Sequence, residues 1–100
     1  MATAIATGTF AAHEITITGG AAAEAFTFAD DVDVVEVISN GAGEVYVRVD
    51  GTAATDKGAN TYRLPAATTS VNREIPMSGS NKVVSVFADV TSVVSVTKLS

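Results

Sequence analysis

The chain of 100 residues has no cysteine and no tryptophan, and it has a single histidine. Without cysteine it has no disulfide framework, thiolate nucleophile or cysteine-ligated metal site. No apolar stretch approaches the ~20 residues that a membrane helix requires, and residues 1–8 lack the basic and apolar regions of a signal peptide. We therefore expect a soluble protein that uses no ordinary secretion signal.

Basic residues are also few, six against eleven acidic ones, which gives a net charge of −5. Nucleic-acid binding requires a concentrated basic surface, and anionic membranes attract basic segments. The basic residues of this chain are scattered and form no run. Neither nucleic acid nor a membrane surface is an expected partner.

The remaining composition describes one small globular domain. Hydrophobic residues make up 47% of the chain and charged residues 17%, which excludes a disordered tail. Aromatic residues are only 6% and much of the apolar fraction is alanine, so the core should be thin and aliphatic. We expect part of the stability to come from self-association or from a bound surface.

Short strands dominate the sequence that is there. In the segment 44–50, Val45, Val47 and Val49 alternate with polar or amphipathic residues, as in a strand with one buried and one solvated face. Similar patterns, separated by turn residues, occupy 13–18, 25–28, 32–38, 61–64, 71–75, 83–86 and 93–96. This spacing, without a sustained helical period, predicts an all-β fold.

The predicted fold is a single antiparallel β-sandwich, either jelly-roll or Ig-like, with an extended N-terminal arm. Residues 1–12 are interpreted as an arm or an edge strand, and residues 13–100 as the sandwich domain. Pro65 and Pro76 each stop a strand, because proline cannot donate to a sheet ladder.

Three local features carry further expectations. The turn-forming segment 39–43 predicts a hairpin between the strands 32–38 and 44–50. Within 32–38 the alternation slips, which indicates either a β-bulge near Val34 and Val35 or burial on both faces. The near-repeat of 83–86 at 93–96 is interpreted as two adjacent strands of one hairpin.

The residues with reactive side chains form no catalytic constellation. His13 and Glu14 are neighbours on a strand and so point to opposite faces, which predicts a solvated histidine. Asp30, Asp31 and Asp33 are interpreted as an acidic turn, with cation binding as the alternative. We expect no enzymatic activity, no metal site and no cofactor.

Tyr46, Arg48, Tyr62 and Arg63 are the candidate recognition residues, because tyrosine and arginine dominate binding hot spots. Tyr46 and Arg48 share the outward face of one strand, where they could form an aromatic and cationic patch. In the alternative interpretation, Arg48 pairs with a cross-strand acid such as Glu36 and Tyr46 covers the sheet.

Three segments resemble a known group of proteins: Ile38-Ser39-Asn40-Gly41, then Val45 to Thr52 (VYVRVDGT), then Ala59 to Ala66 (ANTYRLPA). These segments resemble small β-sandwich virion proteins of tailed bacteriophages, over roughly residues 32–98. The resemblance implies a structural role in the virion, as a capsid decoration (cement) protein, a head–tail connector or tail subunit, or a surface domain.

Among these roles we expect capsid decoration, with the major capsid protein as partner and the capsid exterior as location, after synthesis in the host bacterial cytoplasm. Ile5 and Phe10 are the expected anchors of the N-terminal arm. The resemblance further implies a homo-oligomer, with a trimer at a local symmetry axis. A carbohydrate-binding module, with Tyr46 and Tyr62 as sugar-stacking platforms, is an alternative from another class.

Overall fold

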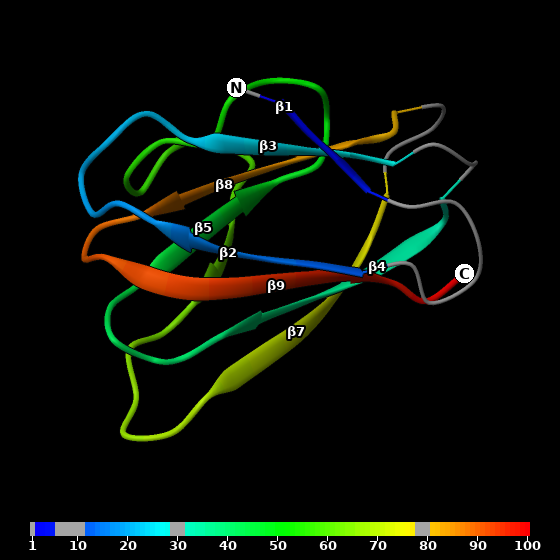
Figure 1. Ribbon diagram of the computed structural model, residues 1–100. Coiled ribbons are helices and arrows are strands. Elements are labelled where there is room, and N and C mark those ends of the chain that lie inside the picture. Colours follow the sequence, from blue (N-terminus) through cyan, green and yellow to red (C-terminus); the bar gives the residue numbers. More distant parts are fainter. Residues whose placement is uncertain (1, 6–11, 29–31, 78–80) are drawn as a thin grey trace.

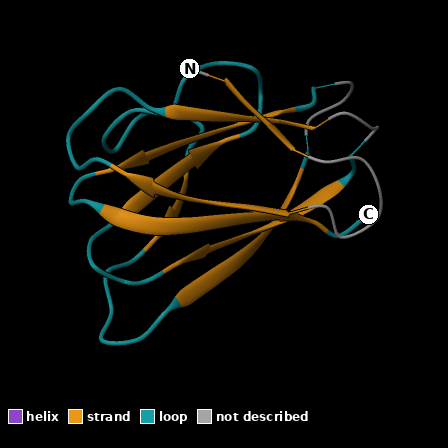
Figure 2. Ribbon diagram, viewed as in Figure 1, coloured by secondary structure: helices purple, strands orange, loops and turns teal. Residues whose placement is uncertain are grey.

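The computed structural model describes residues 2–5, 12–28, 32–77 and 81–100 (Figure 1). Within these ranges the chain forms strands and no helix, as Figure 2 shows, and so no helix that could cross a membrane. The strands are β1 (Ala2–Ile5), β2 (Ala12–Ile17), β3 (Glu24–Phe28), β4 (Val34–Ser39), β5 (Val45–Arg48), β6 (Tyr62–Leu64), β7 (Val71–Pro76), β8 (Val83–Ala88) and β9 (Ser92–Lys98).

The strands pack as two layers, which confirms the predicted β-sandwich. One sheet has the order β1-β3-β8-β5-β6 and the other the order β2-β9-β4-β7. All strand pairs are antiparallel except β1 and β3, which are parallel. Figure 1 shows the two layers lying face to face. The chain is therefore all-β, as its composition and periodicity predict.

The pairing of β2 to β9 has a nested order. β2 pairs with β9, β3 with β8, β4 with β7 and β5 with β6, as in one long hairpin folded at its middle. The pairs β4·β9 and β5·β8 then join these ribbons into two sheets. This connectivity is that of a jelly roll. It decides between the two topologies that the strand pattern allows.

The core lies between the sheets and is mostly aliphatic. β2 to β9 each contribute inward-facing residues to it, mostly branched aliphatic side chains, with two phenylalanines from β3. Its fully buried members are Ile17, Phe26, Val35, Val37, Val45, Val47, Leu64, Ile75, Val84, Val86, Ala88, Val94 and Val96, with Phe28, Val32 and Val49 nearly as buried. The fold therefore has the thin, mostly aliphatic core that the composition indicates.

The predicted hairpin between the strands 32–38 and 44–50 is wrong. β4 pairs with β7 and β9 in one sheet, whereas β5 pairs with β6 and β8 in the other. The segment between them crosses from sheet to sheet. Its backbone is held by other elements, since Asn40 N donates to Val93 O at 3.0 Å and Ala67 N donates to Gly41 O at 3.0 Å.

The physical reason is that both strands have one face to bury. Alternation tells which side chains face the core, but two strands on opposite sides of that core show the same alternation. Glycine and asparagine supply the positive φ that a turn needs, and a crossing loop needs it as much as a hairpin does. Gly41 has φ of 82° in this loop.

The same correction applies to the near-repeat. β8 and β9 lie in different sheets, so they are not the two strands of a hairpin. Their matching valines both line the core instead, with Val84 and Val86 from one sheet and Val94 and Val96 from the other all fully buried. The repeated Val-Val-Ser-Val sequence therefore reflects two strands that line the same core from opposite sheets.

The strand 32–38 has no bulge within its observed bounds. β4 begins at Val34 and is paired residue by residue with both β7 and β9. Its burial alternates regularly, with Val35, Val37 and Ser39 buried. Val32 is also buried, but it precedes the strand. The change of phase in the sequence therefore marks the start of the strand rather than an insertion in it.

The first strand and the two prolines occupy sheet edges. β1 is an edge strand, in which Ala2 is paired with Ala25 and Ile5 with Phe28. Pro76 ends β7, the edge of the four-stranded sheet, and Pro65 follows β6, the edge of the five-stranded sheet. Both prolines lie where proline is tolerated.

Candidate functional site

Tyr46 and Arg63 lie directly opposite each other on β5 and β6 and are joined through Glu44. The Tyr46 hydroxyl donates to one carboxylate oxygen of Glu44, and Arg63 Nη1 donates to the other at 3.1 Å. The Tyr46 ring also lies beside Phe87 of β8, with 6.4 Å between ring centroids. These side chains form a network on the outer face of the five-stranded sheet.

The network changes the acidity of both partners. The hydrogen bond to Glu44, together with burial, raises the pKa of Tyr46 to about 12. The same hydrogen bond lowers the pKa of the Glu44 carboxyl below its ordinary value, and the positive charge of Arg63 adds to this effect. Near neutral pH the hydroxyl is thus kept protonated and the carboxyl ionised.

Arg48 is held by its own strand end rather than by the other sheet. Its Nε donates to Asp50 Oδ1 at 2.7 Å and its Nη1 to Ala59 O at 3.1 Å. The hydrogen bond from Arg48 lowers the pKa of the Asp50 carboxyl. The predicted pairing with Glu36 is wrong, because Glu36 lies in the four-stranded sheet, where it accepts from Asn72 Nδ2 at 2.7 Å.

The loop 51–60 covers the outer face over β5 and β8. Ala54 N donates to the Ser85 Oγ of β8 at 2.9 Å, and both residues are buried. Asn81 Nδ2 donates to the carbonyls of Val49 and Val83 at 2.6 Å each, which ties the start of the loop to β8. Tyr46, on the same outer face, is only 2% exposed.

This burial decides between the two interpretations of the hairpin face. Tyr46 covers the sheet and is itself covered, so it presents no open aromatic surface. The side chain of Arg63 is 56% exposed and that of Arg48 only 18%. Neither Tyr46 nor Arg48, the two residues of β5 predicted to point outward, therefore has enough exposed surface to be the main contact with a partner. The sequence feature that could have predicted the packing of the loop 51–60 on the sheet is the pair Ala53-Ala54, two apolar residues inside a polar loop.

Tyr62 lies on the other face of β6 and does not join Tyr46. It is half-buried against the core, and the Arg73 guanidinium of β7 lies over its ring at 5.1 Å from the centroid. Arg73 Nη1 also donates to Arg63 O at 3.2 Å. Arg73 thus closes the gap between the β6 and β7 edges. Arg73 was not among the residues predicted from the sequence, because no pattern near it in the chain indicates that it contacts Tyr62.

The remaining predicted residues have separate positions. Ile5 ends β1, and Phe10 lies outside the described residues, as do Asp30 and Asp31. Asp33 is described, and its backbone N–H donates to Ser100 O at 2.7 Å. Within the described ranges, no three acidic, histidine or cysteine side chains gather in a way that could hold a metal ion.

His13 is half-buried rather than fully solvated. Its ring lies 6.0 Å from that of Phe26, which places it at the open side of the core between β2 and β3. Glu14 points to the opposite face of β2 and is exposed. The prediction that the two side chains cannot converge is therefore confirmed.

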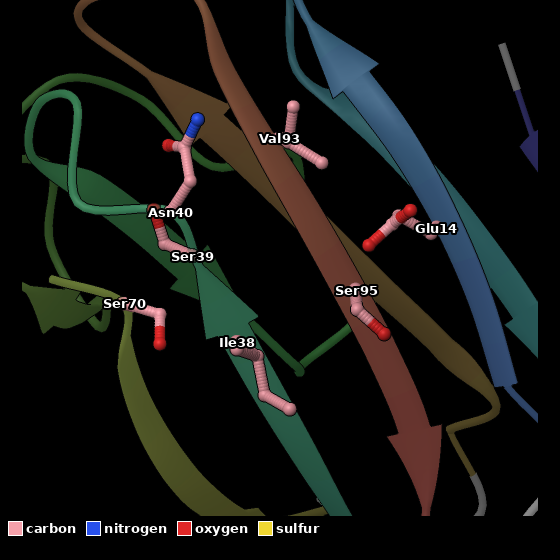
Figure 3. Close-up of a pocket in the computed structure, with 7 residues that line it drawn as sticks. All are labelled: Glu14, Ile38, Ser39, Asn40, Ser70, Val93 and Ser95. Carbon is pink, nitrogen blue, oxygen red and sulfur yellow. The ribbon is translucent and has the colours of Figure 1, made fainter.

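A shallow pocket of about 140 Å³ lies on the outer face of the four-stranded sheet (Figure 3). Glu14 of β2 lies opposite Ser95 of β9, which in turn lies opposite Ile38 of β4. Asn40 and Val93 line it toward one end of the sandwich. The carboxylate, hydroxyl and amide could hold a small polar group by hydrogen bonds.

A second pocket, of about 260 Å³, lies on the outer face of the five-stranded sheet beside the loop 51–60. It is lined by small side chains, among them Ala25 of β3, Ser85 of β8 and Ala53 of the loop. Neither pocket includes Tyr46, Arg48, Tyr62 or Arg63. The recognition residues expected from sequence and these two pockets are therefore different places.

Comparison with known proteins adds no relative: no family model, no curated protein and no solved structure matches the chain.

Proposed function

We propose that the protein is a structural component of a tailed-bacteriophage virion, a capsid decoration protein that binds the shell exterior. The observation that carries the proposal is the nested jelly-roll order of β2 to β9. Jelly rolls are a recurrent architecture of viral capsid domains, so the topology supports a virion role by analogy of fold.

The segments that resemble phage virion proteins support the same conclusion. Val45 to Thr52 forms β5 and the start of the covering loop, and Ala59 to Ala66 forms the end of that loop and β6. β5 and β6 are paired, with Val45 opposite Leu64 and Val47 opposite Tyr62. Two of the three resembling segments thus fall on one structural unit, a strand pair and the loop between its strands, and the third, Ile38 to Gly41, lies at the end of β4.

The mechanism that we propose is stabilisation by selective binding. The major capsid protein is the partner, and the protein, made in the bacterial cytoplasm, binds the assembled lattice and not the separate subunits. A ligand that binds only the assembled state shifts the equilibrium toward that state. The N-terminal residues, with Ile5 and Phe10 as anchors, make the contact and leave the sandwich as a rigid body on the shell.

The test is co-sedimentation of the purified protein with emptied shells of the phage whose genome carries the gene. We expect the full chain to sediment with the shells and to raise their thermal disruption temperature. A variant lacking residues 2–11 loses β1, the edge strand beside β3, and keeps β2 to β9; it should remain folded by circular dichroism and lose binding. Unchanged occupancy of the truncated protein would refute the role of the N-terminal residues.

Two results would overturn the proposal as a whole. The first is that the full chain, at saturating concentration, does not bind shells. The second is that negative-stain images show closed rings of the protein alone, which indicate a connector or tail subunit. A carbohydrate-binding role is not favoured, since Tyr46 is buried and Arg73 lies over the ring of Tyr62.

A further inference from the structure

The pocket on the outer face of the four-stranded sheet combines a carboxylate with hydroxyl and apolar side chains (Figure 3). Glu14 of β2 lies directly opposite Ser95 of β9, and Ile38 of β4 lies on the other side of Ser95. Val93, two positions before Ser95, points to the same face of the sheet. One acidic group therefore lies beside a hydroxyl and two partly exposed apolar side chains.

The charges around this pocket are of one sign. Among the described residues, the outward-facing charged side chains of the sheet are Glu14, Glu36 and Glu74, one each on β2, β4 and β7. The two basic residues of its strands, Arg73 and Lys98, belong to the core-facing series, opposite Val37 and Val35. Glu14 takes part in none of the ion pairs found in the described part of the chain. The pocket therefore favours a cationic group.

The size and lining of the pocket limit the kind of cation. Its volume of about 140 Å³ is well below the ~300 Å³ at which pockets for whole small molecules begin. A calcium ion takes about six or more oxygen ligands. Glu14 is the one acidic residue among the described residues that line the pocket. The pocket therefore suits a single organic cation carried on an apolar stem, the size of one side chain.

We propose that this pocket binds a lysine side chain of a partner protein. The ammonium lies between Glu14 and Ser95, whose Cβ atoms are about 5 Å apart because the two residues are directly opposed. The aliphatic stem lies on Ile38 and Val93, as lysine stems do on apolar surface. Lysine is assigned rather than arginine, because a compact ammonium donates in several directions and a planar guanidinium matches the edge of one carboxylate.

The lysine belongs to a separate protein rather than to a free amine or a second copy of this chain. A shallow pocket covers little of a free amine, whereas a docked protein also contacts the sheet face around the pocket. Two copies of this chain each carry a net charge of −5 and repel each other. Charge complementarity of the face selects a basic surface on the partner. The inference holds for any such partner and does not rest on the capsid assignment.

The probe is Nα-acetyl-lysine methylamide, titrated into the ¹⁵N-labelled full chain and followed by NMR. We expect amide shifts confined to residues 14, 38–40, 70 and 93–95, with a millimolar dissociation constant, because an exposed ion pair contributes little. The norleucine analogue, which has the same stem without the ammonium, should bind roughly threefold more weakly. No shift of these amides up to ~100 mM probe, equal binding of the norleucine analogue, or tighter binding of the arginine analogue would overturn the proposal.

Two pairs of variants separate the pocket from the rest of the face. Glu14→Gln should raise the dissociation constant of the lysine probe roughly threefold, whereas Glu74→Gln, the same charge change outside the pocket, should leave it unchanged. Ser95→Val fills the pocket with two methyl groups and should weaken binding at least as much. Its control is Thr97→Val, at the next outward position of β9 and outside the pocket. Equal effects within either pair would show general attraction to the face and overturn the site.

Two further measurements test the other occupants. Binding of 1,4-diaminobutane more than ~tenfold tighter than the lysine probe would assign the pocket to a free amine and overturn the choice of a protein side chain. Shifts of the pocket amides that follow protein concentration without a probe, and disappear in Lys57→Gln, would assign it to the exposed lysine of a second copy and overturn a separate partner. Because no shell is involved, failure here is distinct from failure of the capsid-binding test.

Discussion

The hydroxyl of Tyr46 donates a hydrogen bond to the carboxylate of Glu44, two positions earlier in the chain. The other oxygen of that carboxylate accepts from Arg63, so one acid joins both strands of the β5·β6 pair. Since the Tyr46 ring is buried, the network has a structural role. It holds β6, a three-residue strand, at the edge of its sheet.

The first prediction concerns alkaline pH. In the folded protein the pKa of Tyr46 is raised to about 12, above the ordinary value of 10.0 that applies in the unfolded chain. The stabilising contribution is therefore complete below pH 10 and is lost as the pH rises to about 12. Chemical unfolding at a series of pH values should show stability falling across this interval.

The tyrosinate absorbance near 295 nm gives the direct measurement. In a Tyr62→Phe background, Tyr46 is the single tyrosine, and its ionisation in the folded state should have a midpoint near 12. Glu44→Gln should move that midpoint toward the ordinary value, because the hydrogen bond to a charged acceptor is its first cause. A midpoint of 10 in the protein with Glu44 intact would contradict the network.

The second prediction concerns the covering loop. Ser85→Ala removes the acceptor of the Ala54 N–H, which is buried beneath the loop. An unsatisfied buried donor costs about 1 to 3 kcal/mol. We expect urea unfolding to show this loss and hydrogen exchange to increase in the loop 51–60.

The near-repeat supplies a matched control for this loop variant. Ser95 occupies the position in β9 that Ser85 occupies in β8, but it lies at the half-exposed outer face of the other sheet. Ser95→Ala should change the free energy of unfolding by less than ~0.5 kcal/mol. Equal losses for the two variants would show that the loop contact contributes nothing.

The third prediction concerns the loop that crosses between β4 and β5. Gly41 has φ of 82°, and an added Cβ would lie 2.4 Å from Thr69 O and 2.8 Å from Ala67 O. Gly20 has a similar φ of 73°, with nothing within 4 Å of such an atom. In both variants alanine must adopt a positive φ, which strains the backbone. Only in Gly41→Ala does the new Cβ also clash with the carbonyl oxygens of the loop 66–70.

The difference between these two glycine variants isolates the packing of the crossing loop. We expect Gly41→Ala to be less stable than Gly20→Ala by at least ~1 kcal/mol, as for overpacked sites. Thermal or urea unfolding measures both variants under one condition. Similar stabilities would mean that the loop 66–70 shifts easily and does not fix the crossing.

The fourth prediction concerns the closed edge. Arg73→Met keeps an aliphatic stem over Tyr62 and removes both the cation and the hydrogen bond to Arg63 O. We expect a loss of about 1 kcal/mol in unfolding free energy, within the range for a cation over an aromatic ring. Light scattering should also detect faster association, because the β7 edge is then unblocked.

Glu74→Gln is the control for the closed edge, since Glu74 is the next residue of β7 and faces away from the core. It removes one of two carboxylates that lie directly opposite each other, Glu74 and Glu36, so it should leave stability unchanged or slightly raised and scattering close to that of the wild type. If Arg73→Met behaves in the same way, the guanidinium does not protect this edge.

The strand periodicity of the sequence was enough to determine the fold class and most of the strands. Alternation of valine with polar residues marked β5, and proline marked the ends of β6 and β7. These features are local, because a side chain's face follows from its position in the strand and a proline lacks its N–H wherever it lies. The all-β sandwich followed from them.

Tertiary structure alone decided which strands pair and which outward side chains stay exposed. β4 and β5 alternate like the two strands of a hairpin, yet they bury their faces against each other across the core. Tyr46 points away from the core as its position requires, yet it is only 2% exposed. The periodicity of a strand specifies a direction relative to its own backbone, and burial depends on whatever distant segment packs there.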